Sequence, residues 1–320
     1  MSGIILEVRD LVKHYPLRRT KLLESPGRVR ALNGVSFAIA RGESFGLVGE
    51  SGCGKTTAGH TIIKLLEPTD GKIFFEGKDI TTIKGERLTD LRRKIQIIFQ
   101  DTAGSLNPRK TVKWILSEPL RAQGVRNRLE IERTIRESLE LVDLDESFLD
   151  RYPHELSGGQ KQRIGILGAL ILEPEFIIAD EPVSALDVSI QAQILNLMKN
   201  LQKRLSLTYL FISHDLGVVH FFCDRIAVMY LGEIVEMAEA TELYVNPCHP
   251  YTQSLLSAIP GENTAGQRII LQGDAPDPTN PPQGCPFHPR CFKRMEICTH
   301  TRPRSVEVSK GHSVGCHLYP

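Results

Sequence analysis

The sequence has almost no net charge, no long apolar run and no leader-like beginning, and each absence excludes a class of protein. Its 39 Lys and Arg residues are balanced by 38 Asp and Glu residues, so a net charge of +1 offers no basic surface to nucleic acid. No apolar run approaches the roughly 20 residues that a membrane helix needs, and residues 1–10 lack the basic region and apolar core of a signal peptide. We therefore expect a protein that stays in the cytosol and reaches a membrane only through a partner.

Cysteine is scarce but unevenly placed. The chain has seven cysteines, an odd number that argues against a disulfide framework in a reducing compartment. Four thiolates suit a tetrahedral zinc ion or a four-iron cluster, and four of the cysteines lie after residue 284. Their intervals of five, six and 17 residues match neither the tight pairs of common zinc folds nor the ferredoxin run, so zinc, an iron–sulfur cluster and free thiols all remain open. The four are Cys285, Cys291, Cys298 and Cys316.

Hydrophobic periodicity predicts an α/β protein with a mostly parallel sheet, because short apolar runs alternate with segments of helical spacing. Residues 3–15 and 29–49 are typical of strands, with turns expected at Asn33–Gly34 and Arg41–Gly42. Residues 104–172 are predicted to form an inserted helical subdomain, and the Pro-rich residues 274–284 a linker. We place the main domain at residues 1–262 and a cysteine-containing extension at 263–320. One helical face, within residues 189–205, is expected to carry Ile190, Ile194, Leu197, Met198 and Leu201.

A glycine-rich loop provides the first chemical signal. GESGCGKTT, Gly49–Thr57, fits the pattern G-x-x-x-x-G-K-[ST], follows a predicted strand and precedes a predicted helix, as the motif requires. Glycines let successive N–H groups wrap around phosphates, Lys55 adds a mobile positive charge, and the Thr56 hydroxyl can bind Mg²⁺. An ordinary glycine turn is the alternative. The loop residues expected to bind nucleotide are Gly49, Ser51, Gly52, Cys53, Gly54, Lys55, Thr56 and Thr57.

Polar side chains at the ends of three other predicted strands extend this site. Asp180 ends the apolar run FIIAD and is a candidate for holding Mg²⁺, while the adjacent Glu181 is a candidate general base for the attacking water. His214 and Gln100 end two further strands and could reach the γ-phosphate, the water or the metal. A strand-ending acidic turn and a structural His are the alternatives.

LSGGQ, residues 156–160, is the most specific motif. Ser157 is a plausible helix cap, and Gly158 and Gly159 leave N–H groups free for an anion. The order GESGCGKTT, Gln100, LSGGQ, FIIADE, SALD (residues 184–187) and His214 resembles the ATP-binding subunit of an ABC transporter. The expected fold is therefore a P-loop ABC ATPase core with an inserted helical subdomain, an N-terminal antiparallel β-subdomain and a small metal-stabilised C-terminal extension.

The resemblance implies a role for each motif residue. Two such domains pack head to tail in this family, so Ser157, Gly158, Gly159 and Gln160 are expected to act on ATP held by the opposite subunit, with Asp187 in the intervening D-loop. Tyr15 matches the aromatic residue that stacks on adenine. The resemblance further implies that Lys55, Thr56, Gln100 and Asp180 bind phosphates and Mg²⁺, that Glu181 activates water and that His214 senses the γ-phosphate.

Further stretches resemble the oligopeptide/dipeptide importer branch, and within it the F-type subunit of a paired ATPase. These are residues 99–109, 152–160 and 249–260, together with CPFHPRC at 285–291. In that branch the cysteine tail is associated with a [4Fe–4S] cluster, which we expect to hold a short tail folded and not to do redox work. Zn²⁺ remains the alternative metal.

The implied partners are a second ATPase subunit, in a homodimer or heterodimer, two transmembrane permeases and, indirectly, an extracytoplasmic solute-binding protein. The protein would then lie at the cytoplasmic face of the cell membrane and power uptake of di- or oligopeptides. Nickel or another small solute is an alternative cargo. Soluble ABC ATPases of DNA repair, ribosome work or iron–sulfur assembly are the alternative classes, and the first two usually need a coiled coil or two ATPase domains in one chain.

Two stretches depart from the family pattern. Residues 101–105, DTAGS, replace an expected Pro- and Tyr-containing stretch after Gln100, and Gly168 stands where an Arg is common after the signature. A mid-helix Gly costs up to about 1 kcal/mol relative to Ala. Neither departure removes a residue needed for hydrolysis, so we expect a competent ATPase.

Overall fold

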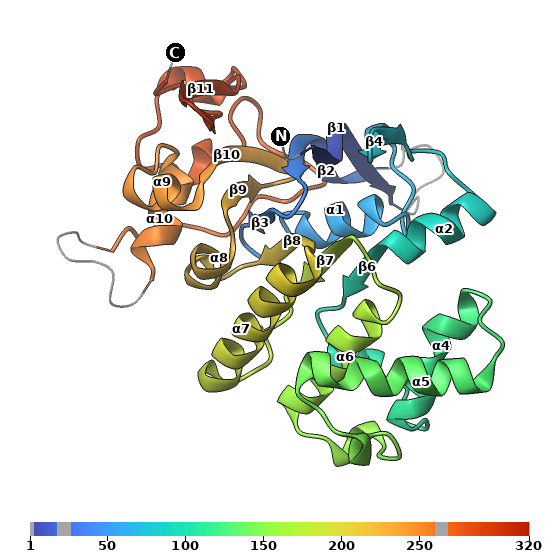
Figure 1. Ribbon diagram of the computed structural model, residues 1–320. Coiled ribbons are helices and arrows are strands. Elements are labelled where there is room, and N and C mark those ends of the chain that lie inside the picture. The colour runs from blue at the N-terminus through green and yellow to red at the C-terminus, as the bar shows by residue number, and fades with distance from the viewer. Residues whose placement is uncertain (1–2, 18–26, 260–267, 320) are drawn as a thin grey trace.

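The computed structural model describes residues 3–17, 27–259 and 268–319 (Figure 1). Its strands are β1 (Ile4–Pro16), β2 (Arg28–Ala40), β3 (Ser44–Val48), β4 (Asp70–Phe75), β5 (Lys78–Asp79), β6 (Ile95–Ile98), β7 (Phe176–Asp180), β8 (Thr208–Ser213), β9 (Arg225–Tyr230), β10 (Glu233–Glu239), β11 (Val306–Ser309) and β12 (His312–Val314). Its helices are α1 (Lys55–Ile62), α2 (Glu86–Lys94), α3 (Thr102–Ser105), α4 (Val112–Ala122), α5 (Arg128–Leu139), α6 (Gly158–Leu170), α7 (Val188–Leu205), α8 (Leu216–Phe222), α9 (Ala240–Val245) and α10 (Pro250–Ser257). Short 3₁₀ turns are η1 (Glu140–Val142), η2 (Glu146–Phe148), η3 (Pro153–Glu155), η4 (His288–Arg290) and η5 (Glu296–Thr299).

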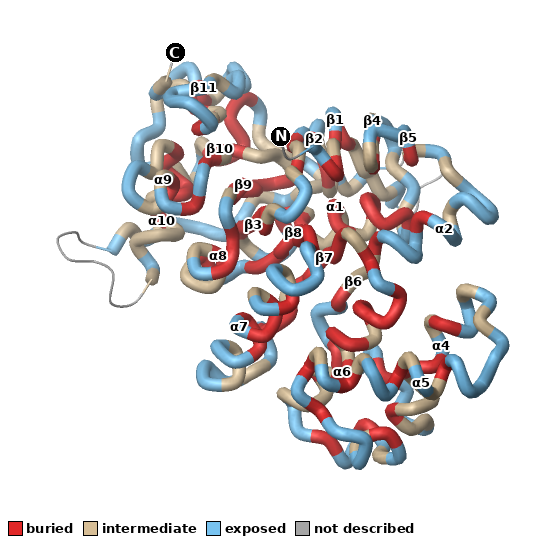
Figure 2. The backbone as a smooth tube through the Cα atoms, in the orientation of Figure 1, coloured by how far each residue is buried: buried red, intermediate tan, exposed pale blue. Residues whose placement is uncertain are grey.

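A largely parallel sheet forms the centre of the molecule. Its strand order is β11-β12-β10-β9-β3-β8-β7-β6, and the pairs from β9 to β6 are parallel. Every residue of β3, β7 and β8 is buried, as expected for strands covered on both faces (Figure 2). The predicted α/β class with a mostly parallel sheet is confirmed.

The predicted N-terminal antiparallel sheet is also confirmed, with the order β2-β1-β4-β5. The turn expected at Asn33–Gly34 was wrong, because β2 runs through both residues. Gly34 has a positive φ of 86°, and the register against β1 shifts by one residue there, from Leu11↔Val35 to Val12↔Asn33. The Asn33 side chain donates to the Leu231 carbonyl at 3.0 Å, so the apparent turn signal is a β-bulge held by a distant contact.

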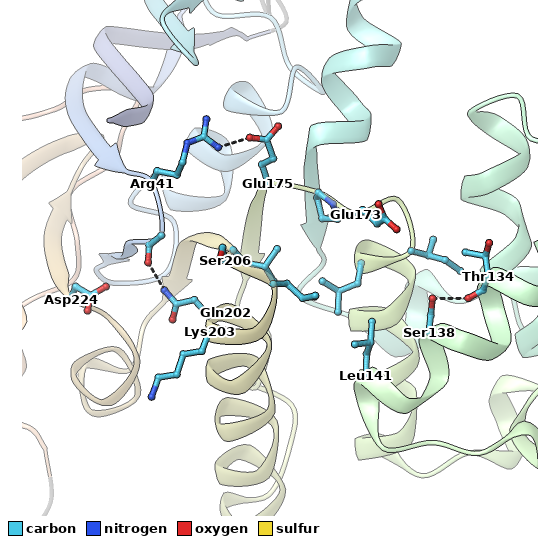
Figure 3. A pocket seen from close by; sticks show the side chains of 16 residues that line it. Arg41, Thr134, Ser138, Leu141, Glu173, Glu175, Gln202, Lys203, Ser206 and Asp224 are labelled. Carbon is cyan, nitrogen blue, oxygen red and sulfur yellow. Dashed lines mark hydrogen bonds and ion pairs between the residues drawn. The ribbon is translucent and has the colours of Figure 1, made fainter. Parts of the chain in front are cut away.

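Between β6 and β7 the described chain is helical (Figure 1). Helices α3, α4 and α5 pack on one another or on α6, and α6 also contacts β6 and α7. A cavity of about 940 Å³ lies between these helices and the C-terminal end of α7 (Figure 3). On the side of the cavity nearest the central sheet, the Gln202 side chain donates to the Gly42 carbonyl at 2.8 Å. Arg41 and Glu175 form an ion pair at the edge of the cavity. The cavity is lined by none of the residues that the motifs single out.

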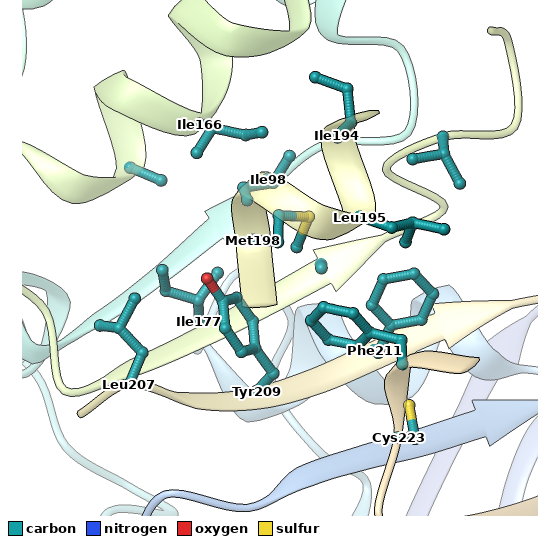
Figure 4. Close-up of a cluster of buried hydrophobic side chains, with 14 of the residues drawn as sticks. Ile98, Ile166, Ile177, Ile194, Leu195, Met198, Leu207, Tyr209, Phe211 and Cys223 are labelled. Atoms are coloured by element: carbon teal, nitrogen blue, oxygen red, sulfur yellow. The ribbon is translucent and has the colours of Figure 1, made fainter. Parts of the chain in front are cut away.

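Helix α7 covers one face of the central sheet. Met198 and Ile194 lie over Ile177 of β7 and over Tyr209 and Phe211 of β8 in one buried cluster (Figure 4). The face predicted for this helix is confirmed at Ile194, Leu197, Met198 and Leu201, which are buried, whereas Ile190 is half-buried. Helix α1 contacts β7 and β8 as well as β2, and so lies between the two sheets. The packing fixes both ends of the phosphate loop that joins β3 to α1.

The C-terminal residues lie against the rest of the chain. Strand β12 pairs with β10, and β11 with β12, so the last hairpin extends the central sheet. The linker at 274–284 passes β2, where the Arg30 amide donates to the Pro278 carbonyl at 3.1 Å. The boundary placed at 262/263 lies outside the described residues, and the division into 1–262 and 263–320 stays a prediction. No helix in the described ranges is long and apolar enough to cross a bilayer.

Candidate nucleotide site

The loop from Gly49 to Lys55 leaves the carboxyl end of β3 and enters α1. Gly49 and Gly54 have φ of 154° and 109°, and the backbone passes too close to neighbours for a side chain. A Cβ on Gly54 would lie 2.2 Å from the Ala31 carbonyl oxygen, and one on Gly49 would lie 2.2 Å from that of Met229. The glycines are therefore required by the loop's shape, which is the shape that presents backbone N–H groups to an anion.

Lys55 and Thr56 begin α1 and face the end of β7. The buried Lys55 ammonium donates to the carbonyls of Gly49, at 2.7 Å, and Glu50, at 2.9 Å. The Thr56 hydroxyl donates to Asp180 Oδ1 at 3.1 Å. Burial raises the pKa of Asp180, although the Thr56 hydrogen bond opposes the shift. A hydroxyl and a buried carboxylate beside a phosphate loop are the oxygen ligands that Mg²⁺ prefers, so these residues fit the predicted metal.

Gln100, Glu181 and His214 converge beyond the ends of β6, β7 and β8. Gln100 Nε2 donates to one Glu181 oxygen at 3.0 Å, and His214 Nδ1 lies 3.1 Å from the other. Because the three strands are parallel neighbours, residues that follow their carboxyl ends meet at one edge of the sheet. The structure therefore brings together three side chains that the sequence places up to 114 positions apart (214 − 100).

The signature segment lies elsewhere. Ser157 caps α6 by accepting from the Gln160 amide at 3.3 Å, and Gln160 accepts in return from the Ser157 amide at 2.9 Å. Ser157 and Gly158 are exposed, and Gly159 lies against Ile190. Helix α6 stands well apart from α1 (Figure 1), so one chain does not bring its own signature to its own phosphate loop. The predicted cap is confirmed.

Two other predicted residues have local roles that the geometry defines. Asp187 caps α7 by accepting from the Ile190 amide at 3.0 Å, and the following Val188 is 81% exposed. Tyr15 pairs with Val29 near the end of β1 and is half-buried, with Lys13 Nζ 5.2 Å from its ring centre. Its neighbour strand β2 also supplies the Ala31 carbonyl that borders Gly54.

Two residues of the phosphate loop, Glu50 and Cys53, occupy positions that the motif leaves unspecified. Cys53 is buried, and burial raises the pKa of its thiol, so it serves as loop filling and not as a nucleophile. Glu50 occupies an unspecified position of the motif, yet Arg290 of the C-terminal segment contacts both of its carboxylate oxygens. No local sequence signal could have found this pair, because its members are 240 residues apart.

The four C-terminal cysteines face a common region. None of the four forms a disulfide within the described residues; Cys285, Cys298 and Cys316 are buried and Cys291 is half-buried. Burial, reinforced by the other three cysteines, raises the pKa of Cys285 to about 11. The one compact group of possible metal donors among the described residues contains none of these four cysteines.

The compact donor group is Glu236, Cys248 and His312. Glu236 is buried and accepts from the backbone amides of Cys248, at 2.6 Å, and His249, at 2.9 Å. His312 Nε2 lies 2.8 Å from the same carboxylate. Direct hydrogen bonds already use both Glu236 oxygens, so the group ties β12 and the start of α10 to β10.

Comparison with known proteins gives two family matches along this chain. The model described as "ABC transporter" matches residues 32–184, and that described as "Oligopeptide/dipeptide transporter, C-terminal region" matches residues 235–298. The chain is 52% identical over 320 residues to the oligopeptide transport ATP-binding protein AppF of Bacillus subtilis, covering 98% of this chain and 97% of that protein. It is 45% identical over 314 residues to the dipeptide transport ATP-binding protein DppF of Haemophilus influenzae, covering 98% and 96%.

Solved structures agree on the fold. The dimeric, post-hydrolysis ATP-binding cassette MJ0796 bound to ADP and Pi superposes with a TM-score of 0.64 at 30% identity, over 74% of this chain and 99% of that one. The structure of cbiO1 from Clostridium perfringens, part of the ABC transporter complex cbiONQ, gives a TM-score of 0.64 at 29% identity, over 76% and 91%. The chain therefore belongs to the ABC transporter family, in its branch of oligopeptide and dipeptide transport ATP-binding proteins.

Proposed function

We propose that this protein hydrolyses ATP to power uptake of di- or oligopeptides through a membrane transporter. The observation that carries the proposal is the convergence of Gln100 and His214 on the Glu181 carboxylate, beside the Thr56–Asp180 pair. It provides a base, an orienting group and a metal position next to a phosphate loop. The peptide cargo is supported by the full-length similarity to AppF and DppF, which are named for oligopeptide and dipeptide transport.

Binding would begin at the phosphate loop. The N–H groups between Glu50 and Thr56, with the N-terminus of α1, would surround the β- and γ-phosphates. Lys55 would leave the Gly49 and Glu50 carbonyls and donate to phosphate oxygens instead. Thr56 and Asp180 would hold Mg²⁺, which supplies positive charge to the phosphate oxygens. Tyr15 would contact the adenine from the end of β1.

Hydrolysis would use the carboxylate of Glu181 as the general base. Water would attack the γ-phosphorus as its proton passes to Glu181; the bond from phosphorus to the bridging oxygen breaks, and ADP and phosphate result. Gln100 now donates to one Glu181 oxygen, and His214 Nδ1 lies 3.1 Å from the other. Both side chains would turn one donor toward the water and the γ-phosphate.

A complete site would need a second ATPase subunit. Ser157 and Gly158 are exposed on α6, far from the loop of their own chain, and would contact ATP held by the partner. Val188, next to Asp187, is an exposed apolar side chain, and this supports a contact with the second subunit there as well. We place the dimer on two permeases at the cytoplasmic face of the membrane, supplied by an extracytoplasmic binding protein. No nucleic acid is expected as a partner.

Transport in living cells tests this proposal. Cells that lack the chain should stop accumulating a labelled tripeptide, and the wild-type gene should restore uptake while a Glu181→Gln gene should not. Uptake of ⁶³Ni²⁺ is measured in parallel. Unchanged peptide uptake in the deleted cells, or a defect confined to nickel, would reject the peptide cargo.

We further propose a [4Fe–4S] cluster on Cys285, Cys291, Cys298 and Cys316. The support is the set of four cysteines, the number of thiolates that a four-iron cluster takes, three of which interact electrostatically with Cys285. When bound, the cluster would supply bonds that join the turns η4 and η5 to the segment after β12. Protein purified without oxygen should contain equal amounts of iron and sulfide. Stoichiometric zinc would decide for the alternative metal, and ready transfer of the cluster to an apo-ferredoxin would favour an assembly ATPase.

A further inference from the structure

Glu50 places a negative charge inside a loop that must bind a polyanion. It directly follows Gly49, and its carbonyl oxygen accepts from Lys55 Nζ at 2.9 Å. Its backbone amide donates to the buried Tyr251 hydroxyl at 2.8 Å, which fixes the peptide unit against α10. A free carboxylate at this point would repel the phosphates of ATP and compete for Lys55, because like charges a few ångströms apart interact strongly where little water intervenes.

Arg290 removes that charge from the loop. Its Nη1 donates to Glu50 Oε2 at 2.8 Å and its Nη2 to Glu50 Oε1 at 3.0 Å, the two-pronged geometry in which guanidinium and carboxylate fit best. The Arg290 side chain is only 9% exposed and that of Glu50 is 30% exposed, so solvent screens the pair weakly. The carboxylate is thereby neutralised and held on the side of the C-terminal segment.

The surroundings hold Arg290 in place. It ends η4 directly before Cys291, and Tyr230 lies within 3.5 Å of its Nη1. Phe287, one turn earlier, is fully buried with its ring centre 5.2 Å from that of Tyr230 and 5.3 Å from that of Tyr251. Tyr251 is the residue that also binds the Glu50 amide. The same aromatic cluster therefore supports both the loop and the arginine that neutralises it.

We propose that Arg290 is a positioning residue for nucleotide binding: it neutralises Glu50 and holds it aside, so that the phosphate loop accepts ATP. The inference rests on the nucleotide role proposed for the loop. It makes the cysteine-bearing extension part of the ATP site, through a contact distinct from the metal ligands themselves. Arg290 touches no reacting atom, so it acts on affinity for ATP and not on the hydrolytic step.

Charge-matched variants test this role in the full-length protein with a fluorescent ATP analogue. Arg290→Gln leaves Glu50 unpaired and should weaken binding about tenfold, while the rate at saturating ATP, measured in the assembled transporter, changes less than about twofold. Glu50→Gln should bind at least as tightly as wild type. The double variant should return to within about threefold of wild type, because the repelling charge is gone. The Arg290→Gln defect should shrink in high salt.

Two further variants separate this role from a general loss of structure. Arg302 also joins the C-terminal segment to the core, but it pairs with Glu233 of β10 and not with a residue of the phosphate loop. Arg302→Gln should leave ATP affinity unchanged. If the double variant binds as weakly as Arg290→Gln, or if Arg302→Gln has the same defect, charge neutralisation at Glu50 is wrong. Lys55→Ala tests the loop itself: unchanged affinity there would overturn the nucleotide site and not merely the role of Arg290.

Discussion

The backbone of Glu181 adopts a conformation that is unusual for a residue with a side chain. Its φ is 46°, a left-handed value that is uncommon for residues other than glycine and costs of order 1–3 kcal/mol. The amide of Glu181 donates to the Ile212 carbonyl at 2.9 Å, and its own carbonyl accepts from the Ser184 hydroxyl at 3.1 Å. These bonds hold the carboxylate between Gln100 and His214. The strained backbone of Glu181 thus sets the direction of its side chain.

Replacing this carboxylate by an amide tests its role as the base. Glu181→Gln should retain ATP binding but lose at least about a hundredfold in turnover, because an amide cannot take the proton from water. ATP should then hold two subunits together, and size-exclusion chromatography with ATP should show the closed dimer. Glu175→Gln, just before the same strand, is the control and should hydrolyse normally. Normal turnover by Glu181→Gln would assign the base elsewhere.

The neighbouring Asp180 carries a charge that a metal site needs but that lowers the stability of the nucleotide-free fold. Burial raises the pKa of Asp180 above its ordinary value of 3.8, so the ionised side chain destabilises the nucleotide-free fold at neutral pH. This penalty is full above the folded pKa and fades as the pH falls through it. The Thr56 hydroxyl offsets only part of the penalty.

Asp180→Asn should therefore raise the melting temperature of the nucleotide-free protein at about pH 8 and raise it less at about pH 5. The same variant should lose the stabilisation that wild type gains from Mg²⁺ and ATP, since it lacks the charged metal ligand. Differential scanning calorimetry at both pH values, with and without Mg²⁺ and ATP, measures each effect. A gain in melting temperature that grows toward acid pH would contradict the direction of the shift.

At the scale of elements, two of the four glycines of helix α6, Gly165 and Gly168, have opposite surroundings. A Cβ on Gly168 would meet nothing within 4 Å, whereas one on Gly165 would lie 2.2 Å from Thr102 Cγ2. Thr102 is buried and its hydroxyl donates to the Phe99 carbonyl at 3.1 Å, so it cannot move freely. Gly168 therefore lowers the stability of the helix with no packing reason, whereas Gly165 is needed for the close approach of α3.

Alanine at the two positions should shift stability in opposite directions. Gly168→Ala should raise the free energy of unfolding by about 0.5–1 kcal/mol, the propensity difference in a helix interior. Gly165→Ala should lower it by about 1–3 kcal/mol through overpacking against Thr102. Urea unfolding followed by circular dichroism measures both changes. Equal shifts in the two variants would mean that the space around each glycine does not govern α6.

Local patterns predicted most elements because their causes are local. The buried strands β3, β7 and β8 are continuous apolar runs, and α7 carries a 3.6-residue apolar period, so both follow from neighbouring residues. The Asn33–Gly34 pair led to a wrong turn prediction, because its β-bulge depends on a contact with Leu231, which is far along the chain. The pairing of β12 with β10 has no local signal either.

The candidate site divides in the same way. The residues at strand ends could be predicted, because parallel strands bring their carboxyl ends to one edge once the motifs fix the strands. The DTAGS stretch that replaces the family pattern forms α3, with Asp101 capping it by accepting from the Gly104 amide at 2.8 Å. The Glu50–Arg290 pair could not be predicted, because only the folded C-terminal segment brings the two charges together.

At the scale of the whole molecule, the C-terminal segment shares its core with the ATPase. Cys285, Phe287 and Cys298 belong to the same buried cluster as residues of the central sheet, α6 and α7. Strand β12 covers the edge that β10 would otherwise expose, and open sheet edges invite association. Although the sequence suggests an appendage, these contacts imply that the segment and the core unfold together.

Two phenylalanines of the segment test this cooperativity. Phe287 is 1% exposed among Tyr230, Tyr251 and His249, while Phe292, five residues on, is 47% exposed. Phe287→Ala should destabilise by about 3–5 kcal/mol and shift a single urea transition, seen alike by circular dichroism of the whole chain and by tyrosine fluorescence. Phe292→Ala should change stability by less than about 0.5 kcal/mol. If Phe287→Ala instead splits the curve, with an early loss of the C-terminal segment and an unchanged later transition, the segment folds as a separate unit, and its contact with the phosphate loop could be broken without unfolding the ATPase.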